Sequence, residues 1–260
     1  MTEVLGGASP EGTVGAALQP VFARPTARTF IPGPLAAGPF AGLQGGGIAG
    51  LLATSMEDAA PQGMEPLSIR VDFLRPAGAE PIHVEVDVMR TGNRAAVLAA
   101  TASIEKNPVA CAVMAFARPL DSSAVSESLP APRVPDGSSP PLPRVSRSKP
   151  TLMDAFEART EDDTFWFRWL VPLCDGASTF AHALAPADWS HGLTRPPTDG
   201  PVACPNLDLS VAVHRRCTGP WIGLRVDSTW TANGLGTAGG VLVDELGTFG
   251  RVAIAFVVVA

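Results

Sequence analysis

Apolar residues in the first half of the chain change from a helical to an alternating spacing. Between Gln44 and Ala60, after three glycines, they recur three and four positions apart: Ile48, Leu51, Leu52 and Met56. This spacing predicts a helix of about four turns. Farther on, Ser68–Arg75 and Ile82–Arg90 alternate apolar with polar residues, and Arg94–Glu105 and Val109–Ala117 flank the turn sequence Lys-Asn-Pro. These patterns predict antiparallel strands that are covered on one face.

The second half repeats this order of helix and strands. A helix is expected at Ser178–Trp189, and strands are expected at Phe165–Leu173, Leu207–Arg215, Trp221–Thr231, Gly239–Asp244 and Gly250–Val259. A shift of 140 residues keeps the inward-facing positions of the two halves in register: Phe73 on Val213, Arg75 on Arg215, Ile82 on Ile222, Val84 on Leu224, Val86 on Val226 and Asn93 on Asn233. We therefore predict an internal duplication of one helix-plus-antiparallel-sheet unit.

A proline-rich stretch separates the two halves. Residues 119–150 contain eight prolines among serine, arginine and alanine, and this composition opposes both a continuing helix and a central strand. We therefore divide the chain into an N-terminal tail (1–20), a first repeat (21–118), this linker (119–150) and a second repeat (151–260).

The ordered segments of the chain resemble the acyl-CoA thioesterase II family. The first half contributes GPFAGLQGGGIAGLLATSMEDA, SIRVDFLRPA and VEVDVMRTGNRAAVLAATASIE, and the second contributes LAPADWSHGL, NLDLSVAVHRR, GPWIGLRVDSTW and GLGTAGGVLVDELGTFGRVAIAF. The resemblance runs from about Val21 to the end of the chain, apart from the linker. It implies an α+β architecture, the double hotdog fold, with two helix-plus-antiparallel-sheet repeats in one chain. It also implies hydrolysis of an acyl thioester without a covalent intermediate.

The same resemblance implies three residues that hold the attacking water. The acidic residue at the end of the second helix corresponds to Asp188, and the Thr, Ser or Asn at the start of the next strand corresponds to Asn206. The Gln of the last strand falls on Val258, eight residues after Gly250, and a valine side chain forms no hydrogen bond. Before the first helix, Gln44 stands where the family often has a histidine. Spacing alone also fits Asp188 as a helix-end residue and Asn206 as a turn residue.

The start of the first helix is a candidate for binding the thioester carbonyl. Hydrolysis needs a nucleophilic water and a stabilised oxyanion, which a carboxylate and backbone N–H groups at a helix start supply. Gly45, Gly46 and Gly47 allow a carbonyl oxygen to approach the backbone, and the positive end of the helix favours developing negative charge. Close packing of the helix on the sheet is the competing reason for these glycines.

Two arginines and two histidines complete the candidate chemistry. Arg75 and Arg215 end equivalent strands and are candidates for binding the phosphates of coenzyme A, although we expect at least one to pair with an acid. Coenzyme A enters as part of the substrate, so no separate cofactor is expected. His182 and His191 are nine residues apart, a poor spacing for a metal; we expect no metal, and surface or satisfied polar roles for both.

Composition restricts these functions further. With 46% apolar residues in 260, the chain has enough apolar side chains for a core, and its net charge of −6 gives no reason to expect nucleic acid or an anionic membrane as a partner. The absence of tyrosine excludes a tyrosine acid, base or nucleophile. The chain start lacks a secretory pattern, and the longest apolar run, Val252–Ala260, is too short for a membrane helix, so a cytoplasmic location is expected. Gly234–Gly239 spells G-x-G-x-x-G but runs into a strand sequence, so we interpret it as a bend.

Three functions on this fold remain open. The first is hydrolysis of an acyl thioester by water that Asp188 and Asn206 hold. The second is a protein that binds an acyl-CoA or acyl ligand without hydrolysing it, which Val258 favours because a water-holding side chain is lost. The third is a hydratase, in which Asp188 and His191 would form an acid–base pair. The partner is a small molecule in each case, and assembly into a homo-oligomer through exposed sheet edges is left open.

Overall fold

The computed structural model describes residues 19–120, 131–143, 149–196 and 202–259. Most of the N-terminal tail and parts of the linker therefore lie outside the described residues. The described part of the first repeat has these elements: β1 (Phe22–Thr26), β2 (Thr29–Pro32), the 3-10 helix η1 (Pro34–Ala36), α1 (Gly45–Ala59), β3 (Glu65–Phe73), β4 (Ile82–Thr91), β5 (Ala95–Ile104) and β6 (Asn107–Ala117).

The second repeat has the same order of two strands, a helix and four strands, but its 3-10 helix precedes the first two strands and a short additional helix follows the main one. Its elements are the 3-10 helix η3 (Leu152–Ala155), β7 (Phe156–Glu161), β8 (Thr164–Trp169), α2 (Thr179–Ala187), α3 (Ser190–Leu193), β9 (Asp208–Val213), β10 (Trp221–Trp230), β11 (Leu235–Asp244) and β12 (Gly247–Val257). The shift of 140 residues predicted from sequence maps β5 onto β11 and β6 onto β12 from end to end.

All these strands join one antiparallel twelve-stranded sheet in the order β1-β2-β4-β5-β6-β3-β9-β12-β11-β10-β8-β7. From either edge of the sheet to its centre, the strands follow in equivalent order: β1, β2, β4, β5, β6 and β3 correspond to β7, β8, β10, β11, β12 and β9. A pseudo-two-fold axis between β3 and β9 therefore relates the two repeats. These two central strands pair with each other, Ile69 with Val211 and Val71 with Leu209. The alternation predicted from sequence holds along β5, whose residues are buried and half-exposed in turn.

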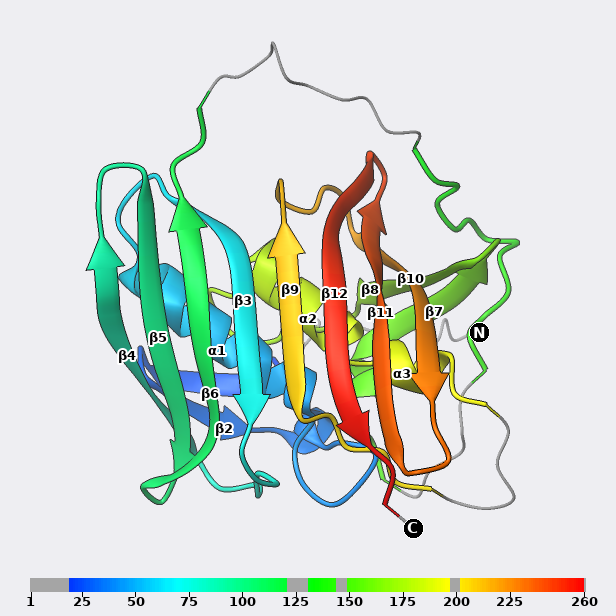
Figure 1. Ribbon diagram of the computed structural model, residues 1–260, viewed down its shortest axis with the longest axis horizontal. Coiled ribbons are helices and arrows are strands. Elements are labelled where there is room, and N and C mark those ends of the chain that lie inside the picture. The colour runs from blue at the N-terminus through cyan, green and yellow to red at the C-terminus, as the bar shows by residue number, and fades with distance from the viewer. Residues whose placement is uncertain (1–18, 121–130, 144–148, 197–201, 260) are drawn as a thin grey trace, which may run out of the picture.

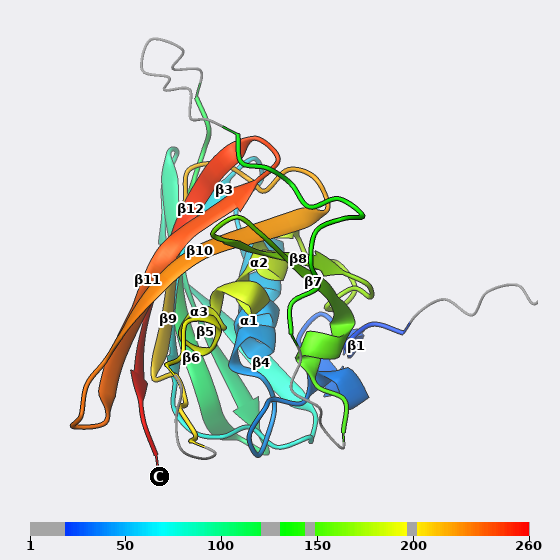
Figure 2. The ribbon, with the colours of Figure 1, turned by 90° about the vertical axis from the view of Figure 1, so that its right-hand side faces the viewer.

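The helices lie on one face of the sheet, and both ends of the sheet curl around them. Figures 1 and 2 show α1 and α2 behind the central strands, with β1 and β7–β8 on the far side of the helices. The two ends meet where the N–H groups of Val21 and Phe22 donate to the carbonyls of Pro172 and Leu173, at 2.9 and 2.8 Å. This enclosure explains why α1 is apolar on nearly all sides and is buried from Gly46 to Met56.

Small residues bring the two helices into close contact. A Cβ on Gly46 would lie 2.7 Å from the Cα of Ala185, and a Cβ on Gly50 would lie 3.1 Å from the carbonyl oxygen of Ala181. The glycines of α1 are therefore needed for helix packing, and they set the start of α1 against the end of α2. No helix among the described residues is long and apolar enough to cross a membrane.

Several sequence expectations need correction. The G-x-G-x-x-G stretch is mostly strand: Gly234, with φ of +79°, forms the turn, but Gly236 and Gly239 lie inside β11. A side chain at Gly236 would collide with the ring of Phe256, so the glycine is there to make room. Strands β1, β2 and β7 were not predicted. Linker residue Pro141 forms an isolated bridge with Arg159 of β7, so part of the linker runs beside this edge strand.

Candidate active site

The carboxyl group of Asp188 connects the end of α2 to the start of α1. Its Oδ2 accepts hydrogen bonds from Gln44 Nε2 and from the backbone N–H of Gly46, both at 2.8 Å. Asp188 is the C-terminal cap of α2, and Gln44 is the N-terminal cap residue of α1, although its side chain does not cap its own helix. The close approach of the two helices at Gly46 and Ala185 brings these groups together across 144 residues of sequence.

Asn206 holds the other oxygen of this carboxyl group. Its Nδ2 donates to Asp188 Oδ1 at 2.6 Å and to the backbone carbonyl of Asp188 at 2.9 Å. Because both partners are acceptors, the orientation of the Asn206 amide is fixed. Its Oδ1 is buried and has no hydrogen-bond partner in the part of the chain that the structure describes. This oxygen is therefore a vacant acceptor beside the carboxyl group.

Burial raises the pKa of Asp188 to about 6, although the hydrogen bonds from Asn206, Gly46 and Gln44 lower it. The side chain is almost completely inaccessible to solvent. A carboxyl group with this pKa is ionised at neutral pH and is a stronger base than an exposed aspartate. These are the properties required of a general base that operates near pH 7.

The first N–H groups of α1 have no intrahelical acceptor, as at any helix start. Asp188 takes that of Gly46, so Gly45 and Gly47 are the remaining candidates for binding an oxyanion. A Cβ on Gly45 would lie 3.0 Å from Phe73 Cζ and 3.3 Å from Asp188 Oδ2. Side chains larger than glycine would therefore crowd the carboxyl group as well as the helix start.

The last strand offers no polar side chain to this cluster. Val258 lies just beyond β12, donates its N–H to the carbonyl of Gly234 at 2.7 Å, and packs beside Phe256. Phe256 is the residue that pairs with Asn206 across the two strands. The strand opens at Gly247 and not at Gly250, so the same count of eight residues falls on Ala255. None of these three side chains forms a hydrogen bond.

The two candidate arginines lie at opposite ends of the central strands. Arg75 follows β3, is exposed, and is near Asn206 along the chain fold, since the N–H of Phe73 donates to the carbonyl of Leu207 at 2.9 Å. In the described residues its side chain makes no hydrogen bond to the Asp188 cluster. Arg215 instead pairs with the buried Asp244, at 2.5 and 2.7 Å. Of the two arginines, Arg75 is therefore the one that follows its strand on the side of Asn206.

His191 is buried, so the surface role that the sequence left open for it is wrong, and it forms a hydrogen bond with the backbone of Cys204. Its ring stacks on that of Phe256 with centroids 4.9 Å apart, and its Nδ1 has no partner among the described residues. Burial lowers the pKa of His191 to about 4, so the ring is neutral at pH 7. His182 is satisfied: its Nε2 accepts from the N–H of Leu173 at 3.2 Å. The stacking of His191 on Phe256 was not predicted. The only indication in the sequence that His191 lies near the site was its position three residues after Asp188.

The pseudo-two-fold places a second carboxyl group at the opposite end of the helices. Ser178, which caps the start of α2, donates its hydroxyl to Glu57 Oε2 at 2.6 Å. The shift of 140 residues puts Pro66 in place of Asn206 and Phe116 in place of Phe256. Since proline has no side-chain donor, this end lacks the amide that holds Asp188. The candidate site is therefore the Asp188 end alone.

Comparison with known protein families gives matches along most of the chain. The acyl-CoA thioesterase N-terminal domain matches residues 33–117, and the acyl-CoA thioesterase C-terminal domain matches residues 108–253. The curated proteins contain no match. The C-terminal domain alone accounts for more than half of the chain.

Solved structures of similar proteins cover nearly the whole fold. The TesB protein of Mycobacterium avium subspecies paratuberculosis has a TM-score of 0.66 at 18% identity, over 92% of this chain and 96% of its own. The acyl-CoA thioesterase II TesB2 of Mycobacterium marinum has a TM-score of 0.66 at 16% identity, over 92% and 94%. A hotdog-fold protein of Alicyclobacillus acidocaldarius has a TM-score of 0.68 at 18% identity, over 90% and 94%.

These similarities confirm the predicted double hotdog fold, and the domain matches establish the family. The N-terminal domain match covers most of the first repeat and the C-terminal domain match covers most of the second, and the pairing of β3 with β9 joins the two repeats into one sheet. The chain belongs to the acyl-CoA thioesterase family.

Proposed function

We propose that this chain hydrolyses acyl-CoA thioesters by direct attack of a water molecule that Asp188 activates and Asn206 helps to hold. The observation that carries the proposal is the buried Asp188 carboxyl group, which residues from both repeats hold in place beside the start of α1. Membership of the acyl-CoA thioesterase family supports the substrate class.

In the proposed reaction the water oxygen bonds to the thioester carbonyl carbon while Asp188 takes one of its protons. The vacant Oδ1 of Asn206 accepts the other hydrogen of this water. The N–H groups of Gly45 and Gly47 bind the oxyanion at the positive end of α1. When the carbon–sulfur bond breaks, the sulfur leaves as thiolate and takes the proton back from Asp188, so the products are a carboxylic acid and free coenzyme A.

The apolar last strand predicts a slow enzyme. Loss of one of three groups that hold the water costs on the order of tenfold to a thousandfold in rate. Phe256, which pairs with Asn206, has no polar group that could hold the water. Coenzyme A is then part of the substrate, with Arg75 as the candidate contact for its phosphates.

The test is thiol release from acetyl-, butyryl- and octanoyl-CoA by the wild type, by Asp188→Ala and Asn206→Ala, and by the matched control Glu57→Gln. Glu57 is the hydrogen-bonded carboxyl group at the opposite end of the helices, so its loss should leave turnover within about twofold. Asp188→Ala should lower kcat by at least about a hundredfold.

Equal losses in the two carboxyl variants would contradict the assignment of Asp188. A wild type that binds acyl-CoA and releases no thiol would contradict hydrolysis and leave a binding protein on the same fold.

A further inference from the structure

The length of the acyl group that the site accepts is limited by what lies behind Asp188. The start of α1 is enclosed: Gln44, Gly46 and Asp188 are all buried. The thiol half of a coenzyme A thioester is large and charged and must stay in solvent. The acyl half is apolar, so we take it to extend inward from a carbonyl that binds at the start of α1, either between the two helices or beneath them.

The route between the helices is closed. The backbones of α1 and α2 approach so closely that a single Cβ on Gly46 would lie 2.7 Å from both Ala185 Cα and Asp188 Cβ. One turn farther along, a Cβ on Gly50 would lie 3.1 Å from the carbonyl oxygen of Ala181. A methylene chain needs more room than one methyl group, so it cannot pass along this seam.

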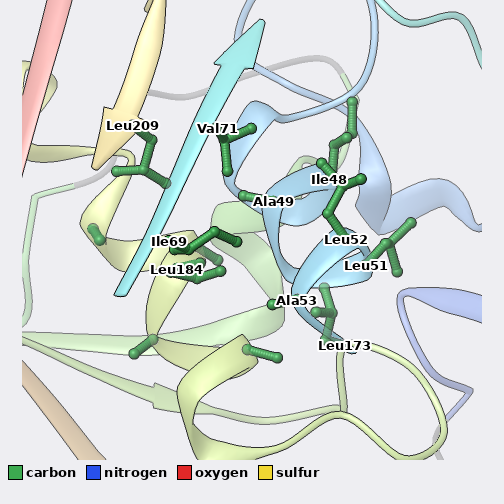
Figure 3. Close-up of a cluster of buried hydrophobic side chains, with 14 of the residues drawn as sticks. Ile48, Ala49, Leu51, Leu52, Ala53, Ile69, Val71, Leu173, Leu184 and Leu209 are labelled. Atoms are coloured by element: carbon green, nitrogen blue, oxygen red, sulfur yellow. The ribbon is translucent and has the colours of Figure 1, made fainter. Parts of the chain in front are cut away.

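The route beneath the helices is filled by side chains of the two central strands and of α2. Figure 3 shows Val71 of β3 beside α1 and Ile69 of β3 beside Leu184 of α2, with Leu209 of β9 on the other side of β3. Leu184, Val71 and Leu209 are completely buried. Leu184 lies one turn before Asp188, whose N–H donates to its carbonyl at 3.1 Å. Leu209 follows Asn206 by three residues.

We propose that this filled space restricts the enzyme to short acyl groups, of about two to four carbons, with Leu184 and Leu209 as the residues that set the limit. The backbone from Asn206 to Leu209 spans about 10 Å. The side chains of Asn206 and Leu209 themselves fill more than half of this distance, which leaves space for only a few carbon atoms. This inference rests on the proposed function, because it takes the carbonyl to bind at the start of α1.

The test compares kcat/KM across acetyl-, butyryl-, hexanoyl-, octanoyl- and palmitoyl-CoA. For the wild type we expect a fall of at least tenfold from butyryl- to octanoyl-CoA. Leu209→Ala and Leu184→Ala each remove three carbon atoms from the wall, room for about three methylenes. Because each methylene that becomes buried raises kcat/KM by about fourfold, octanoyl-CoA should gain up to about 50-fold relative to butyryl-CoA.

Leu98→Ala is the matched control. Leu98 is equally buried, on β5, two strands from β3, so its truncation costs similar stability but opens no room beside Asp188. Its ratio of octanoyl to butyryl turnover should equal that of the wild type. The same ratio in all three leucine variants would overturn the inference, as would a wild type that cleaves palmitoyl-CoA as well as butyryl-CoA.

Failure of the proposed function gives a different result. If the wild type releases no thiol from any substrate, hydrolysis is excluded, and calorimetric binding of the same five acyl-CoAs decides chain length separately. Tighter binding of butyryl- than of octanoyl- and palmitoyl-CoA, with octanoyl-CoA gaining affinity relative to butyryl-CoA in Leu209→Ala, supports the limit. A preference for palmitoyl-CoA, or no binding of either, overturns it.

Discussion

Replacing Asp188 by asparagine separates the catalytic contribution of this residue from its structural contribution. The side chains have the same shape, so the amide oxygen of the variant still accepts from Gln44 and Gly46. Its NH2 group then faces Asn206 Nδ2, which is also a donor, and one or two of the four hydrogen bonds of this cluster are lost. The variant has no carboxylate to take a proton from water.

The expected change in stability at pH 7 is small because two effects oppose each other. Folding raises the pKa of Asp188 from 3.8 to about 6. The folded protein is therefore about 3 kcal/mol more stable when Asp188 is protonated than when it is ionised. This additional stability is fully present below pH 3.8 and is lost as the pH rises through about 6. The variant avoids the cost of ionisation and loses about 1–3 kcal/mol of hydrogen bonding.

The assay is urea unfolding of wild type and Asp188→Asn at pH 4 and pH 7, together with kcat/KM for butyryl-CoA. We expect the free energies of unfolding to differ by less than about 2 kcal/mol at pH 7, and the wild type to gain about 2.5 kcal/mol relative to the variant at pH 4. Turnover should fall by about a hundredfold to ten-thousandfold. In the wild type kcat/KM should rise with pH to a plateau, with an apparent pKa of about 6.

Two results would refute this reasoning. A variant within threefold of wild-type turnover would show that Asp188 is not the base. A loss of more than about 4 kcal/mol at both pH values would show that the carboxyl group is needed to hold the helices together, as in a structural helix-end residue.

Three further substitutions test the surroundings of the site. Gly46→Ala should lower the free energy of unfolding by at least about 2 kcal/mol and reduce turnover, because its Cβ would lie 2.7 Å from Ala185 Cα; thermal melting and thiol release measure the two effects. Arg215→Met leaves the buried Asp244 unpaired and should cost about 3–5 kcal/mol in urea unfolding, with turnover per folded molecule unchanged. Val258→Gln should raise kcat by less than about threefold, because Val258 lies beyond the residue that faces the site; a gain of a hundredfold would contradict this placement.

The long strands and the duplication could be predicted from the sequence. In β4, β5, β10 and β12 the alternation of apolar and polar residues is long and turn residues bound it, so these strands were predicted within a few residues of their limits. The edge strands were not predicted because their patterns are short: β1 includes Pro25 and β2 ends in Pro32. The glycines of β11 weakened the strand signal for another reason, since Gly236 makes room for Phe256, a partner found only in the fold.

The candidate site depends on contacts that spacing cannot reveal. The resemblance to the thioesterase family suggested Asp188 and Asn206, and the three glycines separately suggested the helix start. Their convergence requires the glycine and alanine contact between α1 and α2, which brings together residues 144 positions apart. The raised pKa of Asp188 and the vacant oxygen of Asn206 are likewise properties of burial and orientation, and neither has a sequence signal.

The two repeats build similar helix ends, but they do not build equivalent sites. At one end Asn206 can hold a carboxylate and still present its Oδ1, because an amide both donates and accepts. At the other end Pro66 can do neither, and the Glu57 carboxyl group is bound to a serine hydroxyl that also caps α2. In this duplicated fold the carboxyl group at the Glu57 end therefore has only a structural contact, while the Asp188 end retains a hydrogen-bond acceptor, Asn206 Oδ1, that has no protein partner among the described residues. The asymmetry between Asn206 and Pro66 is the difference that makes the Asp188 end the candidate for chemistry.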